Sequence, residues 1–552
     1  MIYLILFKPG GKRIKIKESQ SILDAAVKNG VHINAACNGI GECGKCRIVV
    51  EKGDAETKKS TLLTRKEVGE GYYLACQTYA KSDLEVLVPP ESMLGEHQIL
   101  EHLNGDFIRR HEKKFVGENL GLAVDIGTTT VVMDLVDLDC GEENIVDVES
   151  KHNKQVIYGA DVLARINHSK DTEGLSKLQQ LIVETINELI GGLMERNSFG
   201  DPQKHKITKI VTSGNTTMTY LLLKKDPCAI QKNIQIDDFR KPATTTAENL
   251  GIRCGNPDAE IYCVPGISNY VGGDIVSDIV ASGMHKSDEI SMIIDVGTNG
   301  EVAVGNKEWV VTCSTSAGPA FEGGETKHGM KASTGAIEKF KVEDGEISYA
   351  VINNDKPRGI CGSGLIDILS ELFLCGVLDY KGKIRKVGGK LDGRIMEGDT
   401  GTEFVVVRAD ETATGKDIVI TEKDVGNIIM TKAAIYAGAS TLTKVGMGFE
   451  DISRIYIAGG FGNFLDIRKA IVLGLLPDQH LKKFEFIGNG SVKGAYLILT
   501  DERVKKEAEE LAKKATYMDL SKAREFTEEY MSAMFIPHQD PGRFPSVEPK
   551  TK

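Results

Sequence analysis

The sequence predicts a multidomain α/β protein in which a small, cysteine-bearing β domain precedes two larger, related lobes. Three observations lead to this prediction. Cysteines gather at C-x5-C-x2-C near the start of the chain, and a strand–Asp–x–Gly–Thr–strand pattern occurs twice further on. At 552 residues the chain is also too long for one hydrophobic core.

Composition excludes several classes of protein. The formal net charge of −11 argues against nucleic acid as a partner, because binding to phosphates needs a basic face. No window approaches the ~20 apolar residues of a membrane span, and the apolar start at residues 2–7 lacks the basic region of a secretory signal. Eleven cysteines, an odd number, argue against a full disulfide framework. We expect a cytoplasmic protein with reduced thiols.

The first ninety residues have the pattern of a small β domain. Residues 2–7 and 13–16 alternate around a Pro–Gly–Gly turn, which predicts a β-hairpin. Ser21 is placed to cap a short helix, and residues 47–50 and 84–88 are predicted strands.

Four cysteines are candidate metal ligands: Cys37, Cys43 and Cys46 in a glycine-rich loop, and Cys76 further on. Glycines permit the positive φ angles and close backbone approach that a loop around an iron–sulfur cluster needs. Zinc is an alternative, although its structural sites usually have two short knuckles, and a disulfide is the other. The spacing and strand order resemble those of the 2Fe-2S ferredoxins, which have a β-grasp fold. That resemblance implies that the four thiolates bind a 2Fe-2S cluster.

The repeated pattern supplies the candidate nucleotide site. Each copy is a buried strand that delivers an aspartate into a tight polar turn, from which a second strand leaves. A single such turn is a common β-turn, but two copies form an internal repeat. Their amides and hydroxyls can bind phosphate, and their aspartates can hold Mg²⁺ directly or through water. The residues concerned are Asp125, Gly127, Thr128, Thr129 and Thr130 in the first copy, and Asp295, Gly297, Thr298, Asn299 and Gly300 in the second.

A buried strand that runs into Gly459 and Gly460 completes this pattern. The two hairpins and the di-glycine turn resemble the actin, Hsp70 and sugar-kinase superfamily, whose two ribonuclease H-like lobes close on ATP. The resemblance implies one phosphate hairpin from each lobe and places Gly459 and Gly460 near adenosine. Two further glycine-rich turns, residues 314–324 and 359–364, fit either an approach to the nucleotide or ordinary loops.

Taken together, the motifs resemble one family nearly from end to end. A C-x5-C-x2-C…C domain, paired aspartate hairpins, S-G-N-T-T-M, G-I-C-G-S-G-L-I-D and A-G-G-F-G are similar to those of the reductive activators of corrinoid proteins. The resemblance implies an ATP-dependent enzyme with ATPase activity. It would pass one electron from the 2Fe-2S cluster to a Co(II) corrinoid protein of a methyltransferase system and regenerate Co(I). It also implies Mg²⁺, an upstream low-potential electron donor and a homodimer formed through the ATPase part.

Two rival functions remain open. One is an ATP-driven electron donor of the 2-hydroxyacyl-CoA dehydratase activator type. The other is a small-molecule kinase with a redox domain, for which Asp161 and Asp274 are candidate bases. The predicted division of the chain is a ferredoxin-like domain at 1–92, a charged linker at 93–118, a first ATPase lobe at 119–290 and a second lobe with a C-terminal extension at 291–552.

Overall fold

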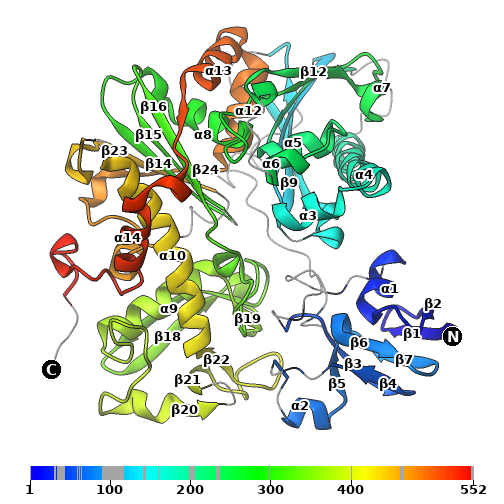
Figure 1. The fold of residues 1–552 in the computed structure, drawn as a ribbon, viewed down its shortest axis with the longest axis vertical. Helices are drawn as coiled ribbons and strands as arrows, with labels where there is room; N and C mark the ends of the chain where they lie inside the picture. The colour runs from blue at the N-terminus through cyan, green and yellow to red at the C-terminus, as the bar shows by residue number, and fades with distance from the viewer. Residues whose placement is uncertain are drawn as a thin grey trace.

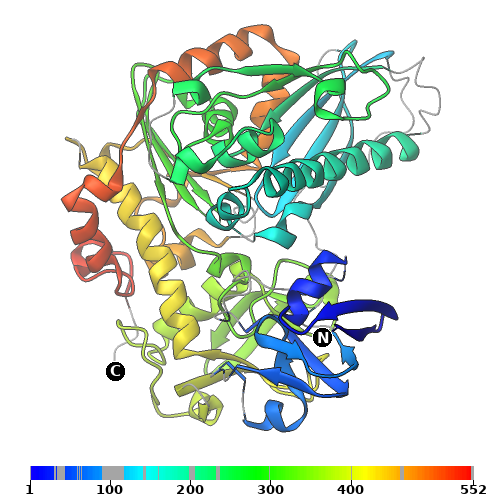
Figure 2. The ribbon, with the colours of Figure 1, turned by 45° about the vertical axis from the view of Figure 1, so that its right-hand side comes forward.

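The N-terminal domain is small and lies beside the lower part of a much larger two-lobed body (Figures 1 and 2). The structure is a computed structural model of the 552-residue chain. It describes residues 2–29, 31, 33, 41, 44–58, 60, 62–63, 65–89, 92, 117–140, 144–159, 161–197, 206–231, 237–297, 299–398, 401–444, 446–459 and 465–548.

A five-stranded sheet forms the N-terminal domain, in the order β2-β1-β7-β3-β5. Strands β1 and β2 form the predicted hairpin, and β1 pairs in parallel with β7. Ser21 caps α1 through its hydroxyl, which accepts from the backbone N–H of Asp24 at 3.1 Å, as predicted. The elements are β1 (Ile2–Lys8), β2 (Lys12–Lys17), α1 (Ile22–Lys28), β3 (Arg47–Lys52), β4 (Ala55–Thr57), α2 (Arg65–Gly69), β5 (Tyr72–Leu74), β6 (Thr78–Ala80) and β7 (Leu84–Leu87).

Each lobe of the larger body has a six-stranded sheet, and the two sheets repeat one topology. The first has the order β10-β9-β8-β11-β13-β12, and the second β24-β23-β14-β15-β16-β25. In each, three strands form an antiparallel meander whose first strand also pairs in parallel with a later one: β8 with β11, and β14 with β23. The internal repeat predicted from the sequence is therefore confirmed as a structural repeat.

The strands and helices of the first lobe run from residue 119 to residue 286. They are β8 (Asn119–Ile126), β9 (Thr130–Asp137), β10 (Ile145–His152), α3 (Val162–His168), α4 (Thr172–Arg196), β11 (Lys206–Ser213), α5 (Thr216–Leu222), α6 (Cys228–Gln231), β12 (Ala243–Thr246), α7 (Ala247–Leu250), β13 (Glu260–Cys263) and α8 (Gly273–Ser282). Helices α4 and α5 bury their apolar side chains against one face of the sheet.

The second lobe continues to the C-terminus. Its main elements are β14 (Ser291–Val296), β15 (Gly300–Gly305), β16 (Val310–Thr315), α9 (Gly362–Leu374), α10 (Glu422–Thr443), β23 (Arg454–Ala458), α11 (Ile467–Leu473), β24 (Phe484–Gly488), α12 (Gly490–Thr500), α13 (Glu502–Lys514), β25 (Thr516–Tyr517) and α14 (Arg524–Ala533). Two small sheets extend it, formed by β17 (Ala336–Glu343), β18 (Glu346–Val351) and β19 (Gly359–Ile360), and by β20 (Ile395–Gly398), β21 (Gly401–Val407) and β22 (Ile418–Thr421).

The two six-stranded sheets share one hydrophobic core. Helices α8 and α12 pack against each other between the sheets, where Ile275 and Ala495 join Ala123 of the first sheet and Ile293 of the second. Helix α12 follows β24 of the second sheet in sequence and contacts β8 and β11 of the first sheet. This packing brings Asp125, near the start of the first lobe in sequence, into contact with Asn489 and Ser491 at the start of α12. No helix in the described ranges is long and apolar enough to cross a membrane.

Candidate functional site

The first Asp–Gly–Thr hairpin joins β8 to β9 at the boundary between the lobes. Asp125 is the penultimate residue of β8, and β9 begins at Thr130. A Cβ at Gly127 would lie 2.6 Å from the carbonyl oxygen of Thr130, so the turn needs glycine there. Thr129 reaches across the boundary, because its hydroxyl donates to Oε2 of Glu322 in the second lobe at 3.5 Å.

Polar side chains of the first lobe hold this turn from behind. Asn153 donates to the carbonyl oxygen of Gly127 at 2.9 Å, and Asn215 donates to Oγ1 of Thr128 at 3.2 Å. Arg165 donates from Nη2 to the carbonyl oxygen of Thr128. Its side chain is fully buried, so a guanidinium lies directly behind the predicted phosphate turn.

The second hairpin joins β14 to β15 in the equivalent place. Asp295 is again the penultimate residue of its strand, and β15 begins at Gly300. The turn closes through the N–H of Gly297, which donates to the carbonyl oxygen of Asn299 at 3.1 Å. Thr298, predicted to bind phosphate, lies outside the described residues.

The predicted di-glycine turn begins beside the second hairpin. Gly459 has φ +92°, and a Cβ there would lie 2.5 Å from Oδ1 of Asp295. Glycine therefore permits both the positive φ angle and the close approach to the carboxylate. Gly460 lies outside the described residues, and the role of this turn at adenosine stays a prediction.

Five carboxyl groups face one another around the hairpins: Asp125, Asp274, Asp278, Asp295 and Glu301. Burial, followed by the neighbouring carboxylates, raises the pKa of Asp274 to about 7, and that of Asp295 also to about 7. The same two causes raise the pKa of Asp278 and of Glu301 well above their usual range. In the described part of the chain, none of the five forms an ion pair with a lysine or arginine.

This acidic cluster suits a hard cation. Oδ2 of Asp278 is buried without a hydrogen-bond partner in the described structure, and Asp274 lies in the first turn of α8. No three His, Cys, Asp or Glu side chains converge as a ready-made metal site within the described ranges. Mg²⁺ commonly keeps several waters and binds through one or two carboxylates and phosphate oxygens. The cluster therefore fits Mg²⁺ that arrives with a nucleotide.

The start of α12 supplies two site residues that our sequence reasoning missed. Asn489 donates to Oδ2 of Asp125 at 2.9 Å, and the Ser491 hydroxyl donates to Oδ1 at 2.8 Å. These contacts partly offset the rise that burial causes in the pKa of Asp125. The sequence does contain a pattern that indicates them. Strand β24 ends in a Gly–Asn–Gly–Ser run, which resembles the polar, glycine-containing turns that follow the other strands of the site.

Two of the four predicted cluster ligands lie together inside the N-terminal domain. Cys46 and Cys76 are buried, and their sulfurs are 3.3 Å apart. This separation exceeds the ~2.05 Å of a disulfide bond, so the two sulfurs are not bonded to each other. Cys37 and Cys43 lie outside the described residues.

The loop around these cysteines fits a cluster. Gly41 has φ +93° and Gly44 has φ +67°, as expected from glycines in this loop. Gln77 points Nε2 at the sulfur of Cys76 from 3.6 Å, which adds a donor of the kind that tunes iron–sulfur centres. The paired buried thiols and the positive-φ glycines satisfy the chemistry that a 2Fe-2S cluster requires.

Lys45, the neighbour of Cys46, attaches the cysteine loop to the second lobe. Its buried ammonium donates to the carbonyl oxygens of Thr326 at 2.5 Å and Gly329 at 3.0 Å. Lys416 adds a second contact, with Nζ 5.1 Å from the centroid of the Tyr72 ring. The N-terminal domain therefore docks on the second lobe through the loop that carries the predicted ligands.

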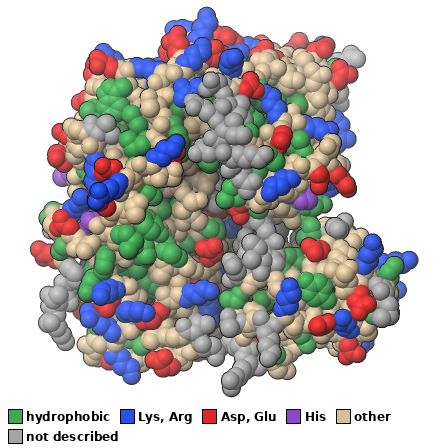
Figure 3. All heavy atoms as spheres, viewed as in Figure 1, with side chains coloured by type: hydrophobic (Ala, Val, Ile, Leu, Met, Phe, Trp, Pro, Cys, Tyr) green, Lys and Arg blue, Asp and Glu red, His purple; other side chains and the backbone are tan. Residues whose placement is uncertain are grey.

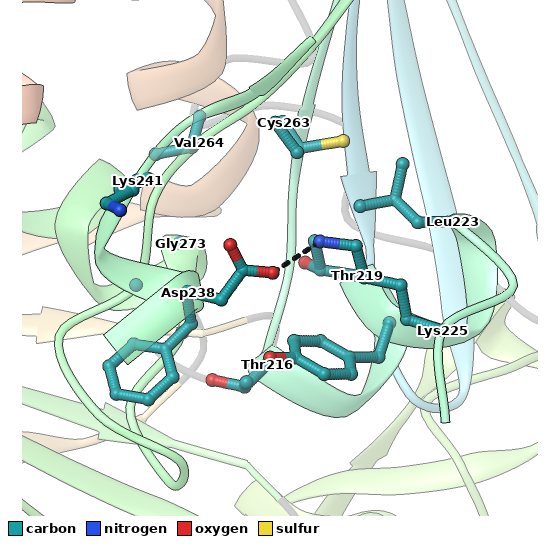
Figure 4. Close-up of a pocket in the computed structure, with 14 residues that line it drawn as sticks. Thr216, Thr219, Leu223, Lys225, Asp238, Lys241, Cys263, Val264 and Gly273 are labelled. Carbon is teal, nitrogen blue, oxygen red and sulfur yellow. Dashed lines mark hydrogen bonds and ion pairs between the residues drawn. The ribbon is translucent and has the colours of Figure 1, made fainter. Parts of the chain in front are cut away.

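A separate pocket on the first lobe bears on the kinase alternative (Figure 4). Lys225 and Asp238 face each other across it, with 2.6 Å between Nζ and Oδ2. The lysine lowers the pKa of Asp238, which makes that carboxylate a weak general base. Of the two candidate bases predicted from the sequence, Asp274 lies in the acidic cluster and Asp161 caps α3 by accepting from the N–H of Ala164 at 2.8 Å.

The two glycine-rich turns have different places. Residues 314–324 include Glu322 and therefore reach the first hairpin. In the turn at 359–364, Ile360 exchanges backbone hydrogen bonds with His328 and Met330 and so supports the segment that binds Lys45. Cys361 is buried, and burial raises the pKa of its thiol.

Comparison with known families covers nearly the whole chain. Residues 7–81 match the family described as 2Fe-2S iron-sulfur cluster binding domain, and residues 120–287 match the RACo middle region. Residues 289–548 match the C-terminal domain of RACo, the ASKHA domain.

Individual proteins agree with these matches. The chain is 30% identical to the corrinoid activation enzyme RamQ of Eubacterium limosum, over 96% of this chain and 98% of that protein. It is 26% identical to the [Co(II) methylated amine-specific corrinoid protein] reductase of Methanosarcina barkeri, over 72% of this chain and 73% of that one. A solved structure titled as a reductive activator for corrinoid, iron-sulfur protein is 37% identical, with a TM-score of 0.71, and the match covers 99% of this chain and 100% of that one.

Proposed function

The chain belongs to the RACo family of corrinoid-protein activators, and we propose that it is an ATP-dependent reductase that restores an inactive corrinoid protein. The reaction is the one-electron reduction of protein-bound Co(II) corrinoid to Co(I), the nucleophile in methyl transfer. The observation that carries this proposal is the docking of a 2Fe-2S-type cysteine loop, through Lys45, onto a two-lobed body with paired aspartate hairpins.

The cysteines of the N-terminal domain would hold the redox centre. Cys37, Cys43, Cys46 and Cys76 are the proposed ligands, and a bound 2Fe-2S cluster supplies one electron at low potential. Buried sulfurs and the nearby Gln77 amide set the polarity around that centre. Lys45 holds the loop against the second lobe and keeps the cysteines in a fixed place relative to the hairpins.

The hairpins would bind MgATP between the lobes. Thr128, Thr129 and Thr130 offer hydroxyls and amides to phosphate from the first hairpin, and Thr298 and Asn299 do so from the second. Asp125 and Asp295 would hold the metal directly or through water, and Gly459 and Gly460 would lie near adenosine. Buried carboxylates that repel one another explain why Mg²⁺ would be required, because the cation removes their repulsion.

ATP helps an uphill reduction only if it binds two states of the complex differently. In a one-electron transfer each ~59 mV uphill costs a factor of ten in the equilibrium constant. Closure of the lobes on ATP would favour a complex in which the corrinoid cobalt has lost its axial ligand, and so lower that barrier. We further propose a homodimer, a low-potential electron donor upstream and a cytoplasmic location.

Anaerobic visible spectroscopy tests this function. The reduced holoprotein is mixed with a Co(II) corrinoid protein, with and without MgATP. We expect the Co(I) band to grow only with MgATP. No Co(I) from any corrinoid protein tested, while the cluster spectrum is intact and ATP binds, would overturn the proposal and favour the dehydratase-activator alternative.

A further inference from the structure

Two cations flank the first hairpin without a carboxylate partner in the part of the chain that the structure describes. Arg165 is the first. Its buried guanidinium donates to the carbonyl oxygens of Gly159 and Thr128, to Oε1 of Gln155 and to the sulfur of Met218, all of them neutral acceptors. Burial lowers the pKa of Arg165 to about 9.

Lys331 is the second cation, and it belongs to the other lobe. It follows a loop, residues 323–330, whose two ends meet: a Cβ at Gly323 would lie 2.5 Å from the backbone nitrogen of Met330. Glu322 and Lys331 therefore lie side by side at the neck of this loop. Since Glu322 accepts from the Thr129 hydroxyl, the neck faces the first hairpin.

The surroundings of the Lys331 ammonium agree with this placement. Burial lowers its pKa to about 8, Glu322 acts in the opposite direction, and Arg165 adds to the lowering. Arg165 of the first lobe and Glu322 of the second therefore both act on the Lys331 ammonium. Among the described residues no ion pair with Lys331 is found, and Glu322 is the carboxylate that acts on its ammonium.

A buried cation without a counterion is costly, and it marks a place where an anion stabilises the protein. Arg165 is fully buried and Lys331 is half-buried. The acidic cluster, which includes the aspartates of both hairpins, suits the metal. We propose that Lys331 is a ligand of the terminal phosphate of the bound nucleotide, contributed by the second lobe opposite the Arg165-supported hairpin. This inference rests on the proposed binding of ATP.

The placement gives Lys331 a specific task. Arg165 and the hairpin belong to the first lobe, whereas Lys331 belongs to the second, so a terminal phosphate between them joins the lobes. The loop that ends at Lys331 also holds Lys45 through the carbonyl oxygens of Thr326 and Gly329. The terminal phosphate and the cysteine loop would therefore contact the same short loop.

Nucleotide titrations of the full-length holoprotein test the inference. Binding of MgATP and MgADP is measured calorimetrically for the wild type, Lys331→Met, Lys331→Arg and, as a matched control, exposed Lys356→Met. We expect Lys331→Met to weaken ATP at least about tenfold and ADP by less than about threefold, because only ATP carries the contacted phosphate. Lys331→Arg should restore most of the ATP affinity, and Lys356→Met should match the wild type.

A merely structural lysine would give a different result. It would weaken ATP and ADP equally or lower the thermal midpoint without nucleotide, and either outcome overturns the inference. Wild-type protein that binds no adenine nucleotide would overturn the proposed ATP dependence, and this inference with it. Wild-type binding together with an unchanged ATP-to-ADP ratio in Lys331→Met would overturn this inference alone.

Discussion

The two hairpins have the same topology and similar sequences, and the aspartates of both belong to the acidic cluster, but a buried guanidinium supports only the first turn in the described structure. Behind the first turn lies the Arg165 guanidinium, and Asp125 in that hairpin is held by two neutral donors from α12. No hydrogen bond or ion pair joins a lysine or arginine to the described residues of the second turn, and Asp295 lies among the buried carboxylates, Asp125 included.

The difference indicates a division of labour within a duplicated motif. A cationic support favours phosphate oxygens, whereas a set of repelling carboxylates favours a divalent cation. We therefore expect the first hairpin to govern phosphate binding and the second to govern the metal. The charges over the rest of the visible face are mixed, with basic and acidic side chains interspersed (Figure 3).

The largest effect should come from Asp295→Asn. The substitution keeps the shape but removes the metal-facing charge, so ATP-stimulated formation of Co(I) should fall by about 100-fold or more. Without nucleotide the variant should melt at a higher temperature than the wild type, because one of the repelling carboxylates is gone. Rates of Co(I) formation and thermal melts measure the two effects. Full ATP stimulation in this variant would remove the second hairpin from the metal site.

Arg165→Met should weaken the first hairpin. The change leaves the carbonyl oxygens of Gly159 and Thr128 without their donor, and Oε1 of Gln155 keeps only the bond from Asn153. Each acceptor left unpaired costs about 1–3 kcal/mol. We expect a thermal midpoint several degrees lower and weaker ATP binding with or without Mg²⁺, in contrast to Asp295→Asn. If instead Arg165→Met affects ATP binding only in the presence of Mg²⁺, the two hairpins do not divide their roles as we infer.

The dependence of ATP affinity on pH should report the protonation of Lys331, which we place opposite the first hairpin. Protonated Lys331 attracts phosphate, so its contribution is present below pH 8 and declines as the pH rises through its pKa of about 8. Arg165, with a pKa lowered to about 9, and Glu322 are the charged groups that act on it. Titrations between pH 7 and 9.5 should show this decline for the wild type. Lys331→Arg should retain its affinity to higher pH, and an identical profile for the two proteins would contradict the assignment.

Asn489→Ala should have the smallest effect. It removes one hydrogen bond to Asp125 and the cap of α12, a loss of about 1 kcal/mol in stability. Because Asp125 then lacks one of its two donors, ATP should bind a few times more weakly. Asp466→Ala, which removes the cap of α11 and no hydrogen bond to Asp125, is the control and should lower the melting temperature alone. Equal ATP affinity in both variants would show that α12 does not position Asp125.

The sequence pattern predicted those parts of the fold and the site that depend on residues close together in the chain. Both hairpins, the Ser21 cap, the β1–β2 hairpin and the duplicated lobes follow from periodicity and turn residues. The contacts of Asp125 with Asn489 and Ser491 could not be predicted, because they join distant segments through the packing of α12 on the first sheet. Lys45 likewise has the sequence pattern of a loop lysine, and only the docking of the domains gives it two carbonyl partners.

The most direct test of the whole account compares two variants in one anaerobic assay of Co(II) corrinoid reduction. Cys46→Ser should lose the reduction while it still binds ATP, because the cysteines and the hairpins belong to different domains. Asp295→Asn should keep the visible spectrum of the cluster and lose the stimulation by MgATP. If Cys46→Ser reduces the corrinoid protein at the wild-type rate, or if Asp295→Asn does so with full ATP stimulation, the proposed separation of electron donation from nucleotide binding is contradicted.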